Sequence, residues 1–289
     1  MNNPNAFTRC ALACLITLLS IALCIGNYLQ AAQNPAPSLP LQSLRELSEP
    51  ETAPNAPLIQ AWTLRQGTRV LFVENHNLPM IDLKLTFAAG SYHDGDAPGL
   101  AAMAQALFGT DSAVKQATDI AREFDRYGVK ITRGIDTEHS YYTLRSLSEE
   151  AIFAPVMALF TETLSRPKFS QENLHRIRHA LETDLKLLQS LPESRALTLL
   201  KETLYVDHPL ARPVNGTRES LQRITARQLR DFYRRAYTAA NAQLVIVGDL
   251  TPEQAKLLSQ QLADTLPQGP ALSVPPGFTA PAHHGKQLH

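Results

Sequence analysis

The chain has 289 residues, of which 44% are hydrophobic and 19% are charged, and this is enough to bury the core of one large domain or two small ones. Lysine plus arginine number 27, as do aspartate plus glutamate, so the formal net charge is zero. Because a neutral chain has no overall field that attracts an anionic polymer, we predict no nucleic-acid partner.

The first 26 residues have the pattern of a targeting segment. An almost unbroken apolar run from Cys10 to Ile25 follows Arg9, the only charge in this segment. The run is short for a transmembrane helix and suits an export signal, so we expect residues 1–26 to be a signal peptide, with a retained membrane anchor at residues 10–25 as the alternative. All three cysteines lie in this run, so the rest of the chain holds no disulfide and no cysteine metal site.

A proline-rich linker at residues 27–57 precedes the predicted folded region, which begins near Leu58. Residues 80–88 alternate apolar and polar side chains, as a half-buried strand does. Pro98 favours the first position of a helix, and Gly128 favours the end of the next helix, which carries Val114 on its apolar face. The elements predicted up to residue 147, in chain order, are strands at 60–64, 69–74 and 80–88, helices at 98–108 and 112–128, and strands at 129–134 and 139–147.

The second half of the chain is mostly helical. Its longest predicted helix carries an apolar stripe that includes Leu174, Ile177 and Leu181, and Thr251 with Gln254 has the pattern of a capping box. The predicted elements are helices at 150–164, 171–190, 193–204 and 225–237, a strand at 243–247, and a helix at 251–266. The aromatic side chains expected in the core are Phe124, Tyr141, Tyr142, Phe160 and Tyr233. Prolines return in residues 267–289, which we predict to be a second linker or tail.

Strands and helices are partly segregated along the chain, which favours an α+β fold over a doubly wound α/β sheet. The sequence contains no glycine-rich dinucleotide fingerprint, no P-loop and no nucleophile elbow. The common nucleotide-binding and serine-hydrolase functions therefore have no support in the sequence.

Three stretches of the sequence carry a resemblance to a known family. They are FAAGSYHDGDAPGLAAMAQALFGT at residues 87–110, HPLARPVNGTRESLQRIT at residues 208–225 and NAQLVIVGDL at residues 241–250. Their order and spacing resemble those of the pitrilysin/insulinase-type zinc metallopeptidases, in particular the branch of the mitochondrial processing peptidase. The resemblance covers residues 58–266 and implies a mixed, largely antiparallel sheet backed by helices, which is one half of the clam-shell fold of that family.

Catalytic members of this family carry the motif H-x-x-E-H on the helix that follows G-L-A, with a further glutamate ligand on a later helix. Zinc is bound by the two histidines and the distant glutamate, and the motif's own glutamate acts on the bound water. The resemblance places Ala102 and Ala106 at the histidine positions, Gln105 at the catalytic glutamate and Glu182 at the third ligand. Because alanine cannot bind zinc and an amide cannot accept the proton, the resemblance implies that the catalytic residues are lost.

The remaining candidate ligands make a weak metal site. Glu182 alone cannot hold zinc, since a catalytic site uses three protein ligands, and we expect a solvated side chain there. A rival site consists of His175, His179 and Glu182, which fall on one stripe of the helix at 171–190. This stripe lies beside the predicted buried face, so we expect it to be solvated as well, and we expect no cofactor in this chain.

The function implied by the resemblance is a non-catalytic subunit that partners a zinc-bearing homologous peptidase subunit, or forms a homo-oligomer. Such a subunit helps to grip extended peptides by adding them to a sheet edge. By the same resemblance the chain is expected in the periplasm, with zinc only in its catalytic partner. Two alternatives stay open, an assembly or scaffold subunit of a membrane-associated complex and a truncated remnant of a longer protein.

Overall fold

The computed structural model describes residues 57–107, 112, 114–206 and 208–273. The expected targeting segment at residues 1–26, almost all of the linker at 27–57 and the tail from residue 274 lie outside the described residues, so these domain assignments stay predictions. In the described part of the chain, no helix combines the length and the apolar character needed to span a bilayer.

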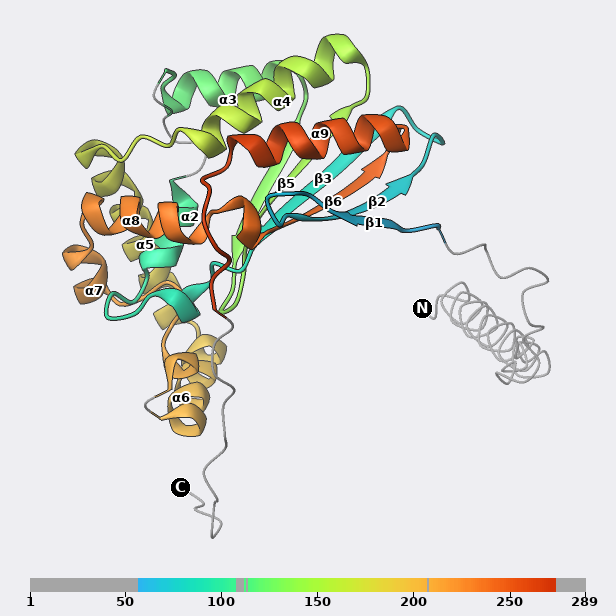
Figure 1. Cartoon of the computed structure of the whole chain (residues 1–289). Helices are drawn as coiled ribbons and strands as arrows, with labels where there is room; N and C mark the ends of the chain where they lie inside the picture. Colours follow the sequence, from blue (N-terminus) through green and yellow to red (C-terminus); the bar gives the residue numbers. More distant parts are fainter. Residues whose placement is uncertain (1–56, 108–111, 113, 207, 274–289) are drawn as a thin grey trace, which may run out of the picture. The chain divides into compact units, whose positions relative to one another are not determined.

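A six-stranded mixed sheet, in the order β1-β2-β6-β3-β5-β4, forms the centre of the fold (Figure 1). Its strands are β1 (Gln60–Thr63), β2 (Arg69–Glu74), β3 (Met80–Phe87), β4 (Lys130–Ile135), β5 (Ser140–Leu147) and β6 (Ala242–Gly248). The β2–β6 pair is parallel, and the other neighbouring pairs are antiparallel. β6 is the last strand in the described residues, and it lies between β2 and β3, so the sheet brings together the beginning and the end of the described fold.

One face of the sheet is covered by the helices α3 (Ala117–Arg126), α4 (Glu150–Ser165) and α9 (Pro252–Thr265), as Figure 1 shows. The side chains of β3 alternate strictly, with Ile81, Leu83, Leu85 and Phe87 buried toward the helices. This alternation is the one expected of a strand with one covered face. The core therefore lies between the sheet and these helices.

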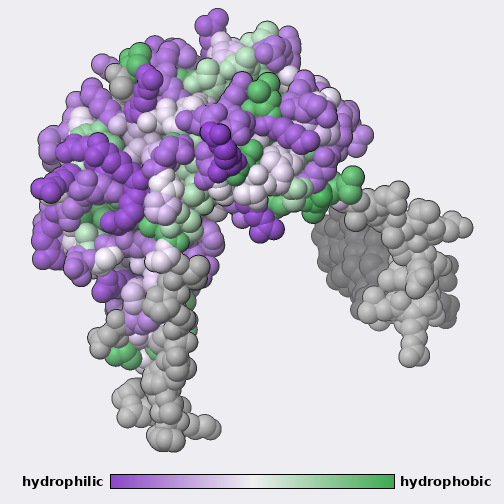
Figure 2. Space-filling view, viewed as in Figure 1, coloured by the Kyte–Doolittle hydropathy of each residue, from purple (hydrophilic) through white to green (hydrophobic). Residues whose placement is uncertain are grey.

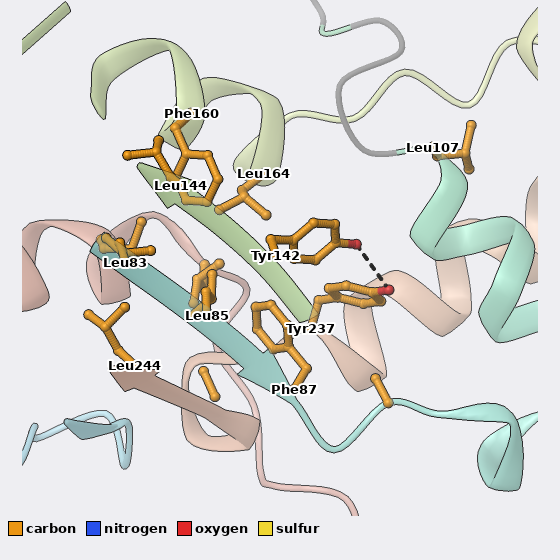
Figure 3. Close-up of a cluster of buried hydrophobic side chains, with 14 of the residues drawn as sticks. Leu83, Leu85, Phe87, Leu107, Tyr142, Leu144, Phe160, Leu164, Tyr237 and Leu244 are labelled. Carbon is orange, nitrogen blue, oxygen red and sulfur yellow. Dashed lines mark hydrogen bonds between the residues drawn. The ribbon is translucent and has the colours of Figure 1, made fainter. Parts of the chain in front are cut away.

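An aromatic cluster forms the part of the core that lies nearest the remaining helices. Figure 3 shows Tyr142 and Tyr237 with their hydroxyls directed at each other, and the Tyr142 hydroxyl donates to that of Tyr237 over 3.3 Å. Phe87 packs on Tyr237 with ring centroids 4.8 Å apart. Burial raises the pKa of both tyrosines, so both stay neutral and act as hydrogen-bonding core residues.

A second group of helices gathers at one end of the sheet (Figure 1). It consists of α2 (Leu100–Ala106), α5 (Gln171–Ser190), α6 (Pro192–Tyr205), α7 (Arg218–Arg223) and α8 (Ala226–Ala236). Three short 3-10 turns connect elements, η1 (Ser91–His93), η2 (Pro209–Ala211) and η3 (Ala239–Asn241). The predicted α+β class, with a mixed and largely antiparallel sheet backed by helices, is confirmed.

Several local predictions need correction. The helix expected to begin after Asp111 begins at Ala117, because the Ser112 hydroxyl accepts the backbone N–H groups of Val114 and Lys115 over 3.1 and 2.9 Å and holds a turn there. Val114 is accordingly exposed and takes no part in a helix face. Tyr141, expected in the core, points to the opposite face of the sheet, where the Lys84 ammonium lies 4.7 Å from its ring centre.

Candidate functional site

The helix α2 carries the positions that the resemblance assigns to the zinc motif, and a buried carboxylate holds its first turn. Asp94 accepts the backbone N–H groups of Gly99 and Ala101, each over 2.7 Å, and these donors at a helix start have no partner within the helix. Gly99, at φ 90°, is the residue before the helix, so Pro98 lies outside α2 and not at its first position as predicted. Burial raises the pKa of Asp94 to about 6, although both N–H bonds favour the carboxylate.

The three motif positions lie on a helix that is almost fully buried. Ala102 is 2% exposed and Gln105 is 6% exposed, while Ala106 is half-buried and packs against the core. Ala102 and Ala106 are one turn apart on α2, the spacing that would place two imidazoles on one face. Methyl groups stand there instead, and the amide between them is neutral, so α2 offers neither a metal ligand nor a base.

The end of α2 is fixed by an arginine that the sequence did not single out. The Arg133 guanidinium, on the edge strand β4, donates to the backbone oxygen of Ala106 over 3.2 Å. The last carbonyls of a helix have no donor within the helix, so Arg133 satisfies one of them at the second histidine position. The structure thus brings β4 directly beside the end of α2.

Glu182 lies on α5, which packs against α2, but its side chain is directed to α7. One carboxylate oxygen is 3.9 Å from the Nε of Arg218, and Gln222 donates to the other over 3.4 Å. The side chain is 17% exposed, so it is held against α7 and does not stand free in solvent as expected. Arg178 strengthens the same contact by donating to two backbone carbonyls at the end of α7, over 2.9 and 3.1 Å.

The rival metal site does not assemble in the structure. His175 and His179 both lie on the exposed side of α5. Among the residues that the structure describes, no three His, Cys, Asp or Glu side chains are grouped so that they could hold a metal ion. The donor set present in this region therefore does not fit zinc.

The first two sequence stretches that carry the resemblance meet in space and hold each other. The Tyr92 hydroxyl and the His208 Nε2 are 3.0 Å apart, and the Arg212 guanidinium donates to the backbone oxygen of Gly95 over 2.6 Å. The Ser220 hydroxyl donates to the backbone oxygen of Pro98 over 2.7 Å. These bonds join the loop before α2 to the segment before α7, so both stretches have a structural role that needs no metal.

Residues of the third stretch contact neighbouring elements at both ends of β6. The Asn241 amide donates to the backbone oxygens of Ala236 and Ala88 over 2.6 and 3.2 Å, tying α8 to the end of β3. Gly248, at φ 142°, leaves no space for a side chain, since a Cβ there would lie 2.1 Å from a backbone oxygen of the neighbouring strand. Asp249 then accepts the Ser148 hydroxyl over 2.5 Å and lies 2.6 Å from the Nδ1 of His76.

The contacts described above for these three stretches hold elements of the fold together. The buried acid Asp94, which has the perturbed pKa expected of a reacting group, has both oxygens occupied by backbone N–H groups and is a helix cap. The side chains at the motif positions of α2 therefore serve packing. Hydrogen bonds to a ligand in this region would come from the edge of β4 beside the helix.

Comparison with known proteins identifies the fold and the sequence pattern. The family model described as "Insulinase (Peptidase family M16)" matches residues 69–218, and the model described as "Peptidase M16 inactive domain" matches residues 223–288. Among solved structures, the peptidase M16 inactive domain from Pseudomonas fluorescens superposes with a TM-score of 0.72 at 36% identity, covering 74% of this chain and 52% of that one.

Two further relatives bear on the arrangement of the whole protein. The chain is 28% identical over 210 residues to the "Non-peptidase homolog YmxG" of Helicobacter pylori, covering 71% of this chain and 48% of that protein. The first half of the periplasmic protease PqqL from Escherichia coli superposes with a TM-score of 0.68 at 18% identity, covering 79% of this chain and 51% of that one. The chain spans about half the length of the curated relatives that it matches. These matches identify the family but do not distinguish its branches. The resemblance to the mitochondrial processing peptidase branch therefore stays a prediction.

Proposed function

The chain belongs to the insulinase family, peptidase family M16, and we propose that it acts there as a non-catalytic half that binds extended peptides beside a zinc-bearing homologue. The observation that carries this proposal is the composition of α2. Its motif positions hold Ala102, Gln105 and Ala106, which supply no ligand and no base. A Helicobacter pylori relative is itself named a non-peptidase homolog, which supports the same assignment.

Peptide binding is assigned to the edge strand β4. In the described residues β4 lies at the end of the sheet and pairs with β5, and an extended peptide can add to an edge strand of this kind. The Arg133 guanidinium donates to the backbone oxygen of Ala106 over 3.2 Å, and this bond holds the edge beside the end of α2. An extended peptide on β4 would therefore pass the place where a catalytic homologue cuts, and here it would be bound without being cut.

The partner is a second M16 half that carries the zinc motif. Support comes from the relatives, of which this chain spans about half, and from the first half of PqqL, of which the superposition covers 51%. We place the pair in the periplasm, as the name of PqqL states for that protein. The apolar run at residues 10–25 would act as the export signal or as an inner-membrane anchor.

Hydrogen exchange with an extended, unstructured peptide tests the binding edge. Saturating peptide is expected to slow amide exchange in β4 (Lys130–Ile135) and to leave the opposite edge strand β1 (Gln60–Thr63) unchanged, which is the matched control within one molecule. Mass spectrometry of the same samples is expected to recover the peptide intact. Cleaved peptide, or protection of β1 without β4, would contradict the proposal.

Restoring the motif tests its placement on α2. The triple variant Ala102→His, Gln105→Glu, Ala106→His places two imidazoles one turn apart, and Glu182 on the adjacent α5 completes the set by exchanging Arg218 for the metal. The variant is expected to bind zinc, and adding Glu182→Gln is expected to weaken that binding sharply. A folded triple variant that takes up no zinc, or takes it up regardless of Glu182, shows that the motif was placed wrongly.

A further inference from the structure

The face of the sheet opposite to α3, α4 and α9 carries an uneven set of charges. In Figure 1 these helices lie on one face of the sheet, and Figure 2 shows that the outer surface of the molecule in the same view is largely hydrophilic. On the opposite face, which we call the open face, the side chains of β3, β5 and β6 are half-buried or exposed. Although the whole chain is neutral, the strand residues on the open face include four bases and a single acid, namely Arg69, Lys84, Lys130, Arg145 and Asp82.

Three of these bases, Lys84, Lys130 and Arg145, line a hollow of about 430 Å³ on the open face. Asp82 is the one acid that lines the same hollow, and Arg145 donates to both of its carboxylate oxygens over 2.6 and 2.7 Å. Among the described residues, no acid lies within ion-pair distance of the Lys84 or Lys130 ammonium. The hollow therefore holds two lysine charges that the described fold does not neutralise.

The pairing of β4 with β5 places two of the bases side by side. Lys130 lies directly opposite Arg145 in the antiparallel register, and like charges in this relation destabilise a sheet. Asp82, which lies opposite Arg145 on the other side, offsets the charge of Arg145 but not that of Lys130. A negatively charged group bound beside Lys130 would offset the remaining repulsion. The arrangement of charges therefore favours an anionic ligand at the β4 edge of the open face.

We propose that β4 selects acidic peptides, because a peptide added to β4 places every second side chain on the open face, in the row that contains Lys130. This inference rests on the proposed peptide binding and names the class of peptide that is bound. A carboxylate in that row pairs with the exposed Lys130 ammonium, and Lys84, about 10 Å further in by the spacing of two strands, adds to the positive field.

The alternate side chains of the bound peptide meet a different surface. On the helix-covered face of β4 they lie beside Ile131 and Ile135, which pack against the hydrophobic core. Cross-strand neighbours on one face of a sheet stabilise it when they are both apolar or oppositely charged. The preferred peptide therefore alternates acidic and apolar residues.

The number and the exposure of the charges favour a peptide over other occupants of the open face. Two unneutralised lysines are too few for a nucleic acid or an anionic membrane, since these are bound by larger sets of bases. A second protein half that covered this face permanently would bury the Lys84 and Lys130 charges, and lysine is depleted at the core of such interfaces. A peptide strand at the edge leaves both ammonium groups in contact with water.

Titration of the purified chain with three fluorescent peptides tests the selection. The peptides share valine at every second position and carry glutamate, glutamine or lysine at the positions between. By fluorescence anisotropy, we expect the glutamate peptide to bind at least about threefold more tightly than the glutamine peptide, and the lysine peptide to bind most weakly. The preference should shrink as salt is raised from about 0.05 M to about 0.5 M, because the Lys130 ammonium is exposed.

Substitution of Lys130 assigns the preference to this residue. We expect Lys130→Gln to abolish the preference and Lys130→Glu to reverse it in favour of the lysine peptide. The matched control Lys256→Gln makes the same change of charge at an exposed position on α9, across the sheet, and is expected to keep the preference.

Equal affinity for the glutamate and glutamine peptides, or a preference that Lys130→Gln does not reduce more than Lys256→Gln does, overturns this inference. If both peptides nevertheless slow amide exchange in β4, the proposed peptide binding stands without it. Peptides that leave exchange in β4 unchanged overturn both proposals. Tighter binding of a single-stranded oligonucleotide than of the glutamate peptide also overturns the assignment to acidic peptides.

Discussion

Asp94 offers the sharpest test of the way in which α2 is held. Its carboxylate caps the helix through the N–H groups of Gly99 and Ala101, while burial raises its pKa from 3.8 to about 6. The folded protein therefore binds a proton at Asp94 more tightly than the unfolded chain does. Stability from this group is greatest at low pH and falls as the pH rises from about 4 to about 6.

The magnitude follows from the difference between the two pKa values. Each tenfold difference in proton affinity corresponds to about 1.4 kcal/mol, so the ionised carboxylate lowers the free energy of unfolding by about 3 kcal/mol relative to its protonated form. Asp94→Asn removes this ionisation. Its amide has one acceptor oxygen, so one of the two N–H groups loses its partner, at a cost of about 1–3 kcal/mol that does not depend on pH.

The assay is urea unfolding of wild type and Asp94→Asn at a series of pH values. Trp62, the single tryptophan, is packed edge-on to Phe72 with ring centroids 6.3 Å apart and reports unfolding by fluorescence. The other titrating groups cancel in the difference between the two proteins. Wild type should lose about 2–3 kcal/mol relative to the variant between about pH 4 and about pH 7. If the stability of wild type relative to the variant is flat or rises with pH, the N–H bonds offset or outweigh burial, and the reasoning is refuted.

Three further predictions concern contacts that hold neighbouring elements of the fold together. The carboxylates of Asp249 and Glu74 raise the pKa of His76 above its ordinary 6.5. The substitution His76→Ala should therefore lower the melting temperature more at about pH 5.5 than at about pH 9, and an equal loss at both pH values would contradict this. Gly248→Ala, which drives a Cβ against a backbone oxygen, should cost about 2–4 kcal/mol, whereas Gly95→Ala, in open space at φ 59°, should cost about 1 kcal/mol by urea unfolding. Arg178→Met should speed amide exchange in α7, since two carbonyls lose their donor, while the exposed control Arg176→Met should not.

Much of the fold could be predicted because the informative residues are those that join elements. The alternation in residues 80–88 fixes which face of β3 is buried. The third stretch that resembles the insulinase family contains Asn241, which ties α8 to the end of β3, and Gly248, which lets β6 pass close to β3. Residues of this kind keep their role whether or not a metal is bound. This is why the resemblance identified the family although the metal ligands are missing.

The details that the sequence did not reveal depend on contacts between distant residues. Pro98 predicts a helix that begins there, but α2 begins at Leu100, because Asp94 accepts the first backbone N–H groups across a loop. Glu182 was expected in solvent, and only the packing of α7 on α5 holds it against Arg218.

The most direct test of the central claim is the metal content and peptidase activity of the purified chain. Because α2 carries Ala102, Gln105 and Ala106, we predict no stoichiometric zinc by elemental analysis after dialysis, and no cleavage of unstructured peptides with zinc added. About one tightly held zinc per chain, together with cleavage that a chelator abolishes, would contradict the account.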